Sequence, residues 1–113
     1  MTAPTVARSH IETEAYEPFE VNGTPCGELH ALRTTSSGTG ALFAGLWRHP
    51  AGQLDYVFPA DETFHMLEGR VRIELRDGPT VELVPGDIVS FAKGDVSTWT
   101  ILEPMKKFFV ISG

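Results

Sequence analysis

Short alternations of apolar and polar residues, separated by turn residues, run through most of the chain. The clearest are residues 71–75 (VRIEL) and 80–84 (TVELV), where apolar side chains occupy every second position. A period of two predicts β-strands, because successive side chains of a strand point to opposite faces of the sheet. Residues 76–79 (RDGP) between them favour a hairpin turn.

The same pattern predicts a mostly β-sheet protein. Eleven glycines and eight prolines fall mostly between the apolar segments, where they favour turns, and no amphipathic helix is found. Short strands at close spacing predict an antiparallel sandwich or barrel. The further predicted strands are residues 41–48, 54–58, 62–67, 88–91, 98–102 and 107–111. Weaker strands are predicted at 11–19 and 28–35, with turn chemistry at 20–27.

Composition narrows the class of protein. The 113 residues suit one domain, and the net charge of −6 argues against nucleic-acid binding, which needs a basic surface. The single cysteine, Cys26, excludes an intrachain disulfide and fits a reducing compartment. Residues 1–10 are expected to form a flexible tail without the apolar core of a signal peptide. We therefore predict a cytoplasmic protein with no membrane partner.

One acidic residue stands at the centre of an aromatic stretch. In residues 52–69 (GQLDYVFPADETFHMLEG), alternation places Glu62, Phe64 and Met66 on one face of a strand. A carboxylate facing a cavity there suits proton transfer or the binding of an amide or ammonium group. The alternative is that Glu62 merely begins an exposed strand after the turn.

The order of these residues resembles the cupin family. The run 62–69 (ETFHMLEG) is similar to the second half of the first cupin motif. Residues 85–94 (PGDIVSFAKG) are similar to the start of the second, with Ala92 in place of its proline. Together with Trp99, these marks resemble the small single-domain cupins related to ureidoglycine aminohydrolase and to the ethanolamine-utilisation cupin.

This resemblance implies the fold and the assembly. It implies an all-β, double-stranded β-helix or jelly-roll cupin barrel, with one cupin domain over residues 11–113 and the core motifs at 42–110. It also implies a homodimer. Metal-binding cupins hold their ion with histidines and a glutamate, and the glutamate corresponds to Glu62. The histidine positions carry other residues here: Tyr56 and Phe58, or Asp55 and Val57 if the alignment slips by one, and Ser97.

Because these ligands are missing, we expect no histidine-based metal site and no cofactor. The predicted pocket lies inside the barrel and is lined by Trp47, Tyr56, Glu62, Phe64, Met66, Ser97 and Trp99. Two functions remain open. The first is binding of a small polar metabolite without a metal. The second, implied by the resemblance, is an enzyme of nitrogen-compound metabolism that acts on a ureido, amino or carboxylate substrate, with Glu62 as the catalytic acid/base.

Several side chains allow two interpretations. Trp99 could stack on a flat ligand and donate its indole N–H to it, or it could simply fill the core. His65 is expected on the opposite face of its strand from Glu62, as a packed or interface residue. The pair Lys106-Lys107 is expected on a solvated face.

Overall fold

A computed structural model describes residues 6–113 as one folded unit built from β-strands. Residues 1–5 of the predicted tail lie outside the described residues, and residues 6–10 contain no helix or strand. The eight strands are β1 (Glu17–Val21), β2 (Thr24–Arg33), β3 (Leu42–His49), β4 (Gly52–Val57), β5 (Asp61–Leu75), β6 (Thr80–Leu83), β7 (Ile88–Phe91) and β8 (Val96–Ser112).

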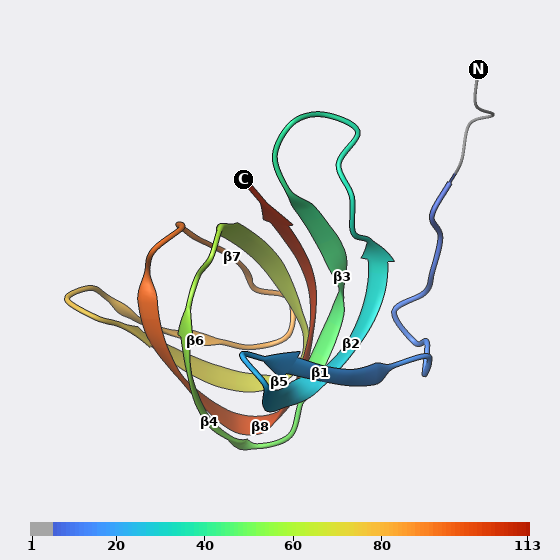
Figure 1. Ribbon diagram of the computed structural model, residues 1–113. Helices are drawn as coiled ribbons and strands as arrows, with labels where there is room; N and C mark the ends of the chain where they lie inside the picture. The colour runs from blue at the N-terminus through green and yellow to red at the C-terminus, as the bar shows by residue number, and fades with distance from the viewer. Residues whose placement is uncertain (1–5) are drawn as a thin grey trace.

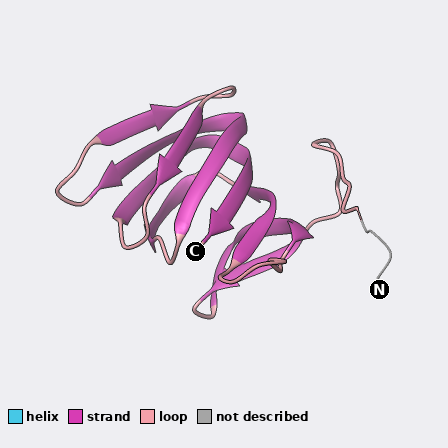
Figure 2. Cartoon of the chain, turned by 90° about the horizontal axis from the view of Figure 1, so that it is seen from above, coloured by secondary structure: helices cyan, strands magenta, loops and turns pink. Residues whose placement is uncertain are grey.

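The strands pair antiparallel in the order β1-β2-β3-β8-β5-β6, while β4 pairs with β8 and β7 with β5. The strands curl into a barrel in Figure 1, and Figure 2 shows the same strands from above. This arrangement fits the jelly roll that the resemblance to the cupins implies. Among residues 6–113, no helix is long and apolar enough to cross a membrane.

The two longest strands, β5 and β8, pair with each other over most of their length. β5 has 15 residues and β8 has 17, and they pair from Asp61 opposite Ser112 to Leu75 opposite Ser97. The second half of β8 also pairs with β3, and its first half with β4. β8 therefore pairs with three other strands, β3, β4 and β5.

The sequence predicts these long strands as shorter pieces. Residues 62–67 and 71–75 belong to one strand, as do residues 98–102 and 107–111. The prediction separates them at Gly69 and Pro104, where the register between β5 and β8 shifts. A bulge bends a strand without ending it, and it tolerates a proline that cannot donate to the ladder. β5 and β8 therefore each continue as one strand through the register shifts near Gly69 and Pro104.

The N-terminal hairpin is also longer than the sequence indicates. Only Asn22 and Gly23 form the turn, with φ angles of 52° and 79°. These angles suit a two-residue hairpin loop. The rest of the predicted turn at 20–27 belongs to β1 and β2. In Figure 1, β1 crosses the front of the barrel.

Gly69, where the register between β5 and β8 shifts, has no room for a side chain. Gly69 has a φ of +87°, and a Cβ atom there would overlap the carbonyl oxygen of Pro104. We expect Gly69→Ala to lower the free energy of unfolding by about 3 kcal/mol or more, because backbone strain and a clash add. Urea unfolding followed by circular dichroism measures this loss.

Gly94 is the matched control for that substitution. Its φ is +91°, yet nothing lies within 4 Å of the position of a Cβ atom. Gly94→Ala should therefore cost only the strain of the left-handed backbone, about 1–2 kcal/mol. Equal losses at the two glycines would show that the close approach to Pro104 does not matter.

Candidate functional site

The barrel contains a cavity of about 590 Å³. Its floor is made by buried side chains: Trp47, Glu62, Trp99, Lys107 and Phe109. Its rim is made by exposed residues: Glu20, Asn22, Ala41, Val57, Pro59 and Gly113. The cavity therefore leads from the surface to the interior, past the β1–β2 hairpin on one side. Its volume lies in the range of small-molecule sites.

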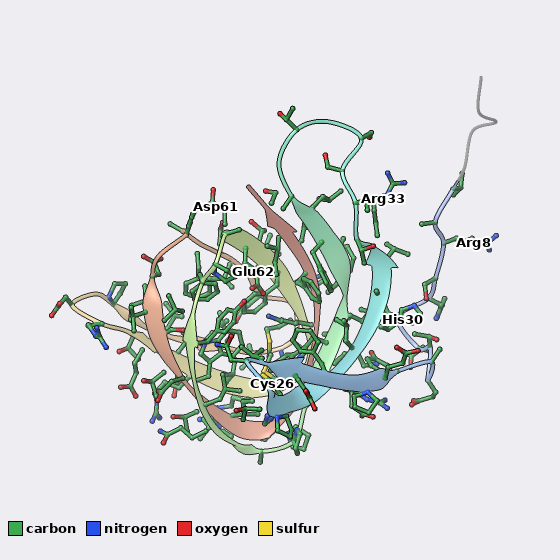
Figure 3. All side chains as sticks on the ribbon, viewed as in Figure 1. Arg8, Cys26, His30, Arg33, Asp61 and Glu62 are labelled. Carbon is green, nitrogen blue, oxygen red and sulfur yellow. The ribbon has the colours of Figure 1, made fainter. Side chains whose placement is uncertain are left out.

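A buried ion pair lies on the cavity floor. The Nζ atom of Lys107 donates a hydrogen bond to Oε2 of Glu62. Glu62 is 2% exposed and Lys107 is 6% exposed. Glu62 belongs to the predicted site, and Figure 3 shows it inside the ring of strands.

The pairing of β5 with β8 explains how these two residues meet. The alternation of β5 points Glu62, Phe64 and Met66 inward, and Lys107 lies opposite Met66 in the register. The lysine side chain must therefore extend along the inner face, past Phe64, to reach Glu62. Its Nζ lies 4.5 Å from the centre of the Phe64 ring, in agreement with that path.

Aromatic rings surround the ammonium group. Besides Phe64, the Nζ of Lys107 lies 5.0 Å from the ring centre of Trp47, 4.8 Å from Trp99 and 5.4 Å from Phe109. A cation within about 6 Å of an aromatic face is attracted by the ring quadrupole. The rings and Glu62 together replace the water that Lys107 loses on burial.

The indole N–H groups are used inside the protein. Trp99 donates its N–H to Oγ of Ser97 at 2.9 Å, and Ser97 donates its hydroxyl to the carbonyl oxygen of Tyr56 at 2.7 Å. Trp47 donates to the carbonyl oxygen of Cys26 at 2.9 Å. In this structure the Trp99 N–H is therefore bonded to Ser97 and is not free for a ligand. The ring faces of Trp47 and Trp99, rather than their N–H groups, are left to contact a ligand.

Burial sets the charge states around the pair. Burial lowers the pKa of the Lys107 ammonium below its usual value, and Glu62 opposes this shift. Burial, assisted by the Glu62 charge, raises the pKa of the Tyr56 phenol to about 12. Burial also raises the pKa of the Cys26 thiol. Near neutral pH the hydroxyl and the thiol are therefore protonated and uncharged.

The predicted pocket residues divide into two groups. Trp47, Tyr56, Glu62 and Trp99 line the cavity. The other three, Phe64, Met66 and Ser97, are buried in the core outside the cavity lining. Whether any of them binds a ligand stays a prediction.

Sequence reasoning missed the lysine at the centre of the site. The prediction that Lys106 and Lys107 form a solvated face is wrong, because both are buried. As neighbours on a strand they point to opposite faces. Lys106 points out, where it bonds to the carbonyl oxygen of Ile11 and to Glu68, and Lys107 points in. The alternation of Lys107 with inward Phe109 and Ile111 was the available sign.

The site does not fit the metal ion that many cupins hold. Within residues 6–113, no three side chains of histidine, cysteine, aspartate or glutamate lie together as metal ligands. Tyr56 and Ser97 face each other in the register, and the serine hydroxyl is committed to the tyrosine carbonyl oxygen. The remaining carboxylate, Glu62, already binds an ammonium group. A metal cation would have to displace that charge, so we derive no chemistry through a metal.

His65 takes the face that alternation predicts. It is exposed, whereas Glu62 on the same strand is buried. His49 packs against Trp47, with ring centres 5.4 Å apart. Neither histidine lines the cavity. The imidazole groups therefore contribute nothing to the chemistry of the cavity floor.

Solved structures of similar shape include several bacterial proteins. EutQ from Clostridium difficile is 18% identical, with a TM-score of 0.68 over 84% of this chain and 75% of that one. A DUF861 family protein from Thermotoga maritima is 33% identical, with a TM-score of 0.55 over 57% of this chain and 73% of that one. A protein of unknown function from Rhizobium leguminosarum is 26% identical, with a TM-score of 0.59 over 74% and 77%. No curated protein sequence matches the chain.

The family model for the EutQ-like cupin domain matches residues 36–109. This match confirms the cupin fold and the resemblance to the ethanolamine-utilisation cupin. The resemblance to ureidoglycine aminohydrolase stays a prediction. The chain belongs to the EutQ-like cupin family.

Proposed function

We propose that the protein binds a small polar metabolite in the barrel cavity, without a histidine-based metal site. The observation that carries this proposal is the ion pair of Glu62 and Lys107 on the floor of a cavity that reaches the surface. Burying two charges costs free energy even when they pair. A site that retains them at the end of an accessible cavity is therefore suited to orienting a polar group of a ligand.

The cavity walls suggest the shape of that ligand. Aromatic and aliphatic side chains make most of the surface between rim and floor, including Phe19, Leu29, Phe43, Leu54 and Ile111. A ligand with a polar head and a short apolar body would bury its body against these walls and place its head at the ion pair. Only Oε2 of Glu62 is hydrogen-bonded among the described residues, so Oε1 can accept from an amide, amine or hydroxyl group.

A calorimetric screen tests the proposal. Ureido, amino, hydroxyl, carbonyl and carboxylate compounds are titrated into the protein, and saturable binding of at least one class is expected. Val57→Trp should weaken that binding at least tenfold, because Val57 lies on the rim and is 57% exposed. Ile88→Trp is the matched control, since Ile88 is 76% exposed and lies outside the cavity lining. Binding that ignores the rim substitution would contradict the proposal.

A second candidate is an enzyme that acts on a ureido, amino or carboxylate substrate, with Glu62 as acid/base. It is favoured by the direct contact of Glu62 with the Lys107 amine, which gives the carboxylate a partner for proton exchange. Glu62→Gln keeps the size of the side chain and removes the base. Turnover of any compound in the panel should then fall at least a hundredfold, and unchanged turnover would exclude Glu62 as the catalyst.

The predicted homodimer and cytoplasmic location belong to the same proposal and stay predictions. Sedimentation velocity at micromolar concentration distinguishes the dimer from the monomer.

A further inference from the structure

We propose that Lys107 is a nucleophile that forms an imine with the carbonyl group of an aldehyde or ketone bound in the barrel cavity. This inference rests on the proposed binding function, because the carbonyl compound must first occupy the cavity. It adds a chemical class of substrate and a covalent step to that function.

The position of Lys107 separates it from the other lysines. Of the three lysines in the sequence, Lys107 lines the cavity. Lys93 is exposed in the turn before β8. Lys106 points to the outside of the barrel and bonds to Glu68 and to the carbonyl oxygen of Ile11. A compound that enters the cavity therefore meets one primary amine at its inner end.

The surroundings of Lys107 suit a nucleophilic amine. Only the neutral amine attacks a carbonyl carbon, and desolvation in an apolar pocket is a known way to favour that form. Lys107 lies among four aromatic rings, and its pKa is lowered by burial. Glu62 opposes that shift, but it is also the group in hydrogen-bond contact that can take the ammonium proton.

The reaction balances with the groups present. Glu62 accepts the ammonium proton, and the neutral Nζ attacks the carbonyl carbon. A nitrogen proton moves to the former carbonyl oxygen, which gives a neutral carbinolamine. Glu62 then returns its proton to the hydroxyl group, which leaves as water while the C=N bond forms. The product is an iminium cation, and the rings that surround Nζ stabilise it as they stabilise the ammonium. No oxidant or reductant is needed.

Reductive trapping tests the inference. The full chain is incubated with butanal and sodium cyanoborohydride near neutral pH, and peptide mass spectrometry measures the modified fraction of each lysine. We expect Lys107 to be modified at least tenfold faster than Lys93, although Lys93 is exposed and Lys107 is buried. Faster modification of Lys93 would overturn the inference. This comparison uses the unaltered protein and does not depend on a variant that folds.

Variants identify the roles of the two residues. Lys107→Arg keeps a cation beside Glu62 but cannot form an imine, so butanal should leave the cavity unmodified. Lys93→Arg is the control and should change nothing at Lys107. Glu62→Gln should slow the modification of Lys107 at least tenfold, because the proton acceptor is lost. Undiminished modification in Glu62→Gln would remove Glu62 from the step.

Butan-1-ol separates failure of this inference from failure of the proposed function. The alcohol has the shape of the aldehyde but no carbonyl group. If both compounds bind in calorimetry, Val57→Trp blocks both, and Lys107 stays unmodified, the binding function stands and the imine is excluded. If neither compound binds and Lys107 stays unmodified, the imine is excluded, and the wider calorimetric panel alone decides the binding function. Modification of Lys107 that Val57→Trp blocks supports both.

Discussion

Replacing Glu62 with leucine is expected to lower the free energy of unfolding by about 3–5 kcal/mol near neutral pH. The substitution leaves the Lys107 ammonium 6% exposed without the carboxylate that now accepts its hydrogen bond. An uncompensated buried charge is among the largest destabilising effects of a single substitution. Urea unfolding followed by circular dichroism measures the loss, because the described fold is one sheet that should unfold cooperatively.

The loss should shrink as the pH rises. In the unfolded chain the Lys107 amine titrates near its model value of 10.5, whereas burial lowers its pKa in the folded protein. Between these two pKa values the unfolded state binds more protons, so stability increases with pH. Glu62 opposes that lowering, so the pKa of Lys107 falls further in the variant. The penalty is full below this lower pKa and shrinks once the pH exceeds it, because the buried amine is then neutral in the folded variant. A loss that stays constant from neutral to alkaline pH would contradict a charged, buried Lys107.

Two further variants isolate the role of the pair. Adding Lys107→Met to Glu62→Leu removes both charges, and the double variant should recover most of the lost stability, as apolar replacements of buried ion pairs often do. The exposed pair of Arg72 and Glu82, 3.0 Å apart, is the matched control. Glu82→Leu should cost less than about 1 kcal/mol. Similar losses for Glu62→Leu and Glu82→Leu would show that burial of the inner pair is unimportant.

The strands were predictable from the sequence because they carry local patterns, whereas the jelly-roll topology came from the resemblance to the cupins. In β5, the alternation of Glu62, Phe64 and Met66 matches the observed burial, and the turn at 76–79 lies where predicted. The continuity of β5 through Gly69 was not predictable in the same way. A glycine near a bulge and a glycine at a turn look alike until the partner strand is known.

The centre of the candidate site was only half predictable. Glu62 stands out because it interrupts an aromatic stretch and matches a cupin motif. Lys107 lies 45 residues away along the chain, and its contact with Glu62 depends on the register of β5 against β8. Alternation gives the face of a side chain but not the strand that lies opposite. A charged residue on an inward face therefore indicates a hidden partner without identifying it.

Replacing Trp99 with alanine is expected to cost about 3–5 kcal/mol of unfolding free energy. Trp99 is 2% exposed, and its ring centre lies 5.9 Å from that of Trp47 and 5.7 Å from that of Phe64. Its indole also contacts the Lys107 ammonium, at 4.8 Å. Removing the indole deletes packing, a cation–π contact and the donor to Ser97 together. Urea unfolding of the variant measures the total.

A conservative variant separates these contributions. Trp99→Phe keeps a ring beside Lys107 and loses the N–H that Ser97 accepts, so its cost should be smaller, about 1–3 kcal/mol. The difference between the two variants then reports what the ring contributes to the wall of the cavity. A loss below about 1 kcal/mol for Trp99→Ala would mean that the neighbouring rings close the space, since the cost of a core truncation depends on how far the site collapses. In that case the neighbouring rings would still exclude water from the ion pair without Trp99. Ligand binding at the cavity floor should then survive the substitution.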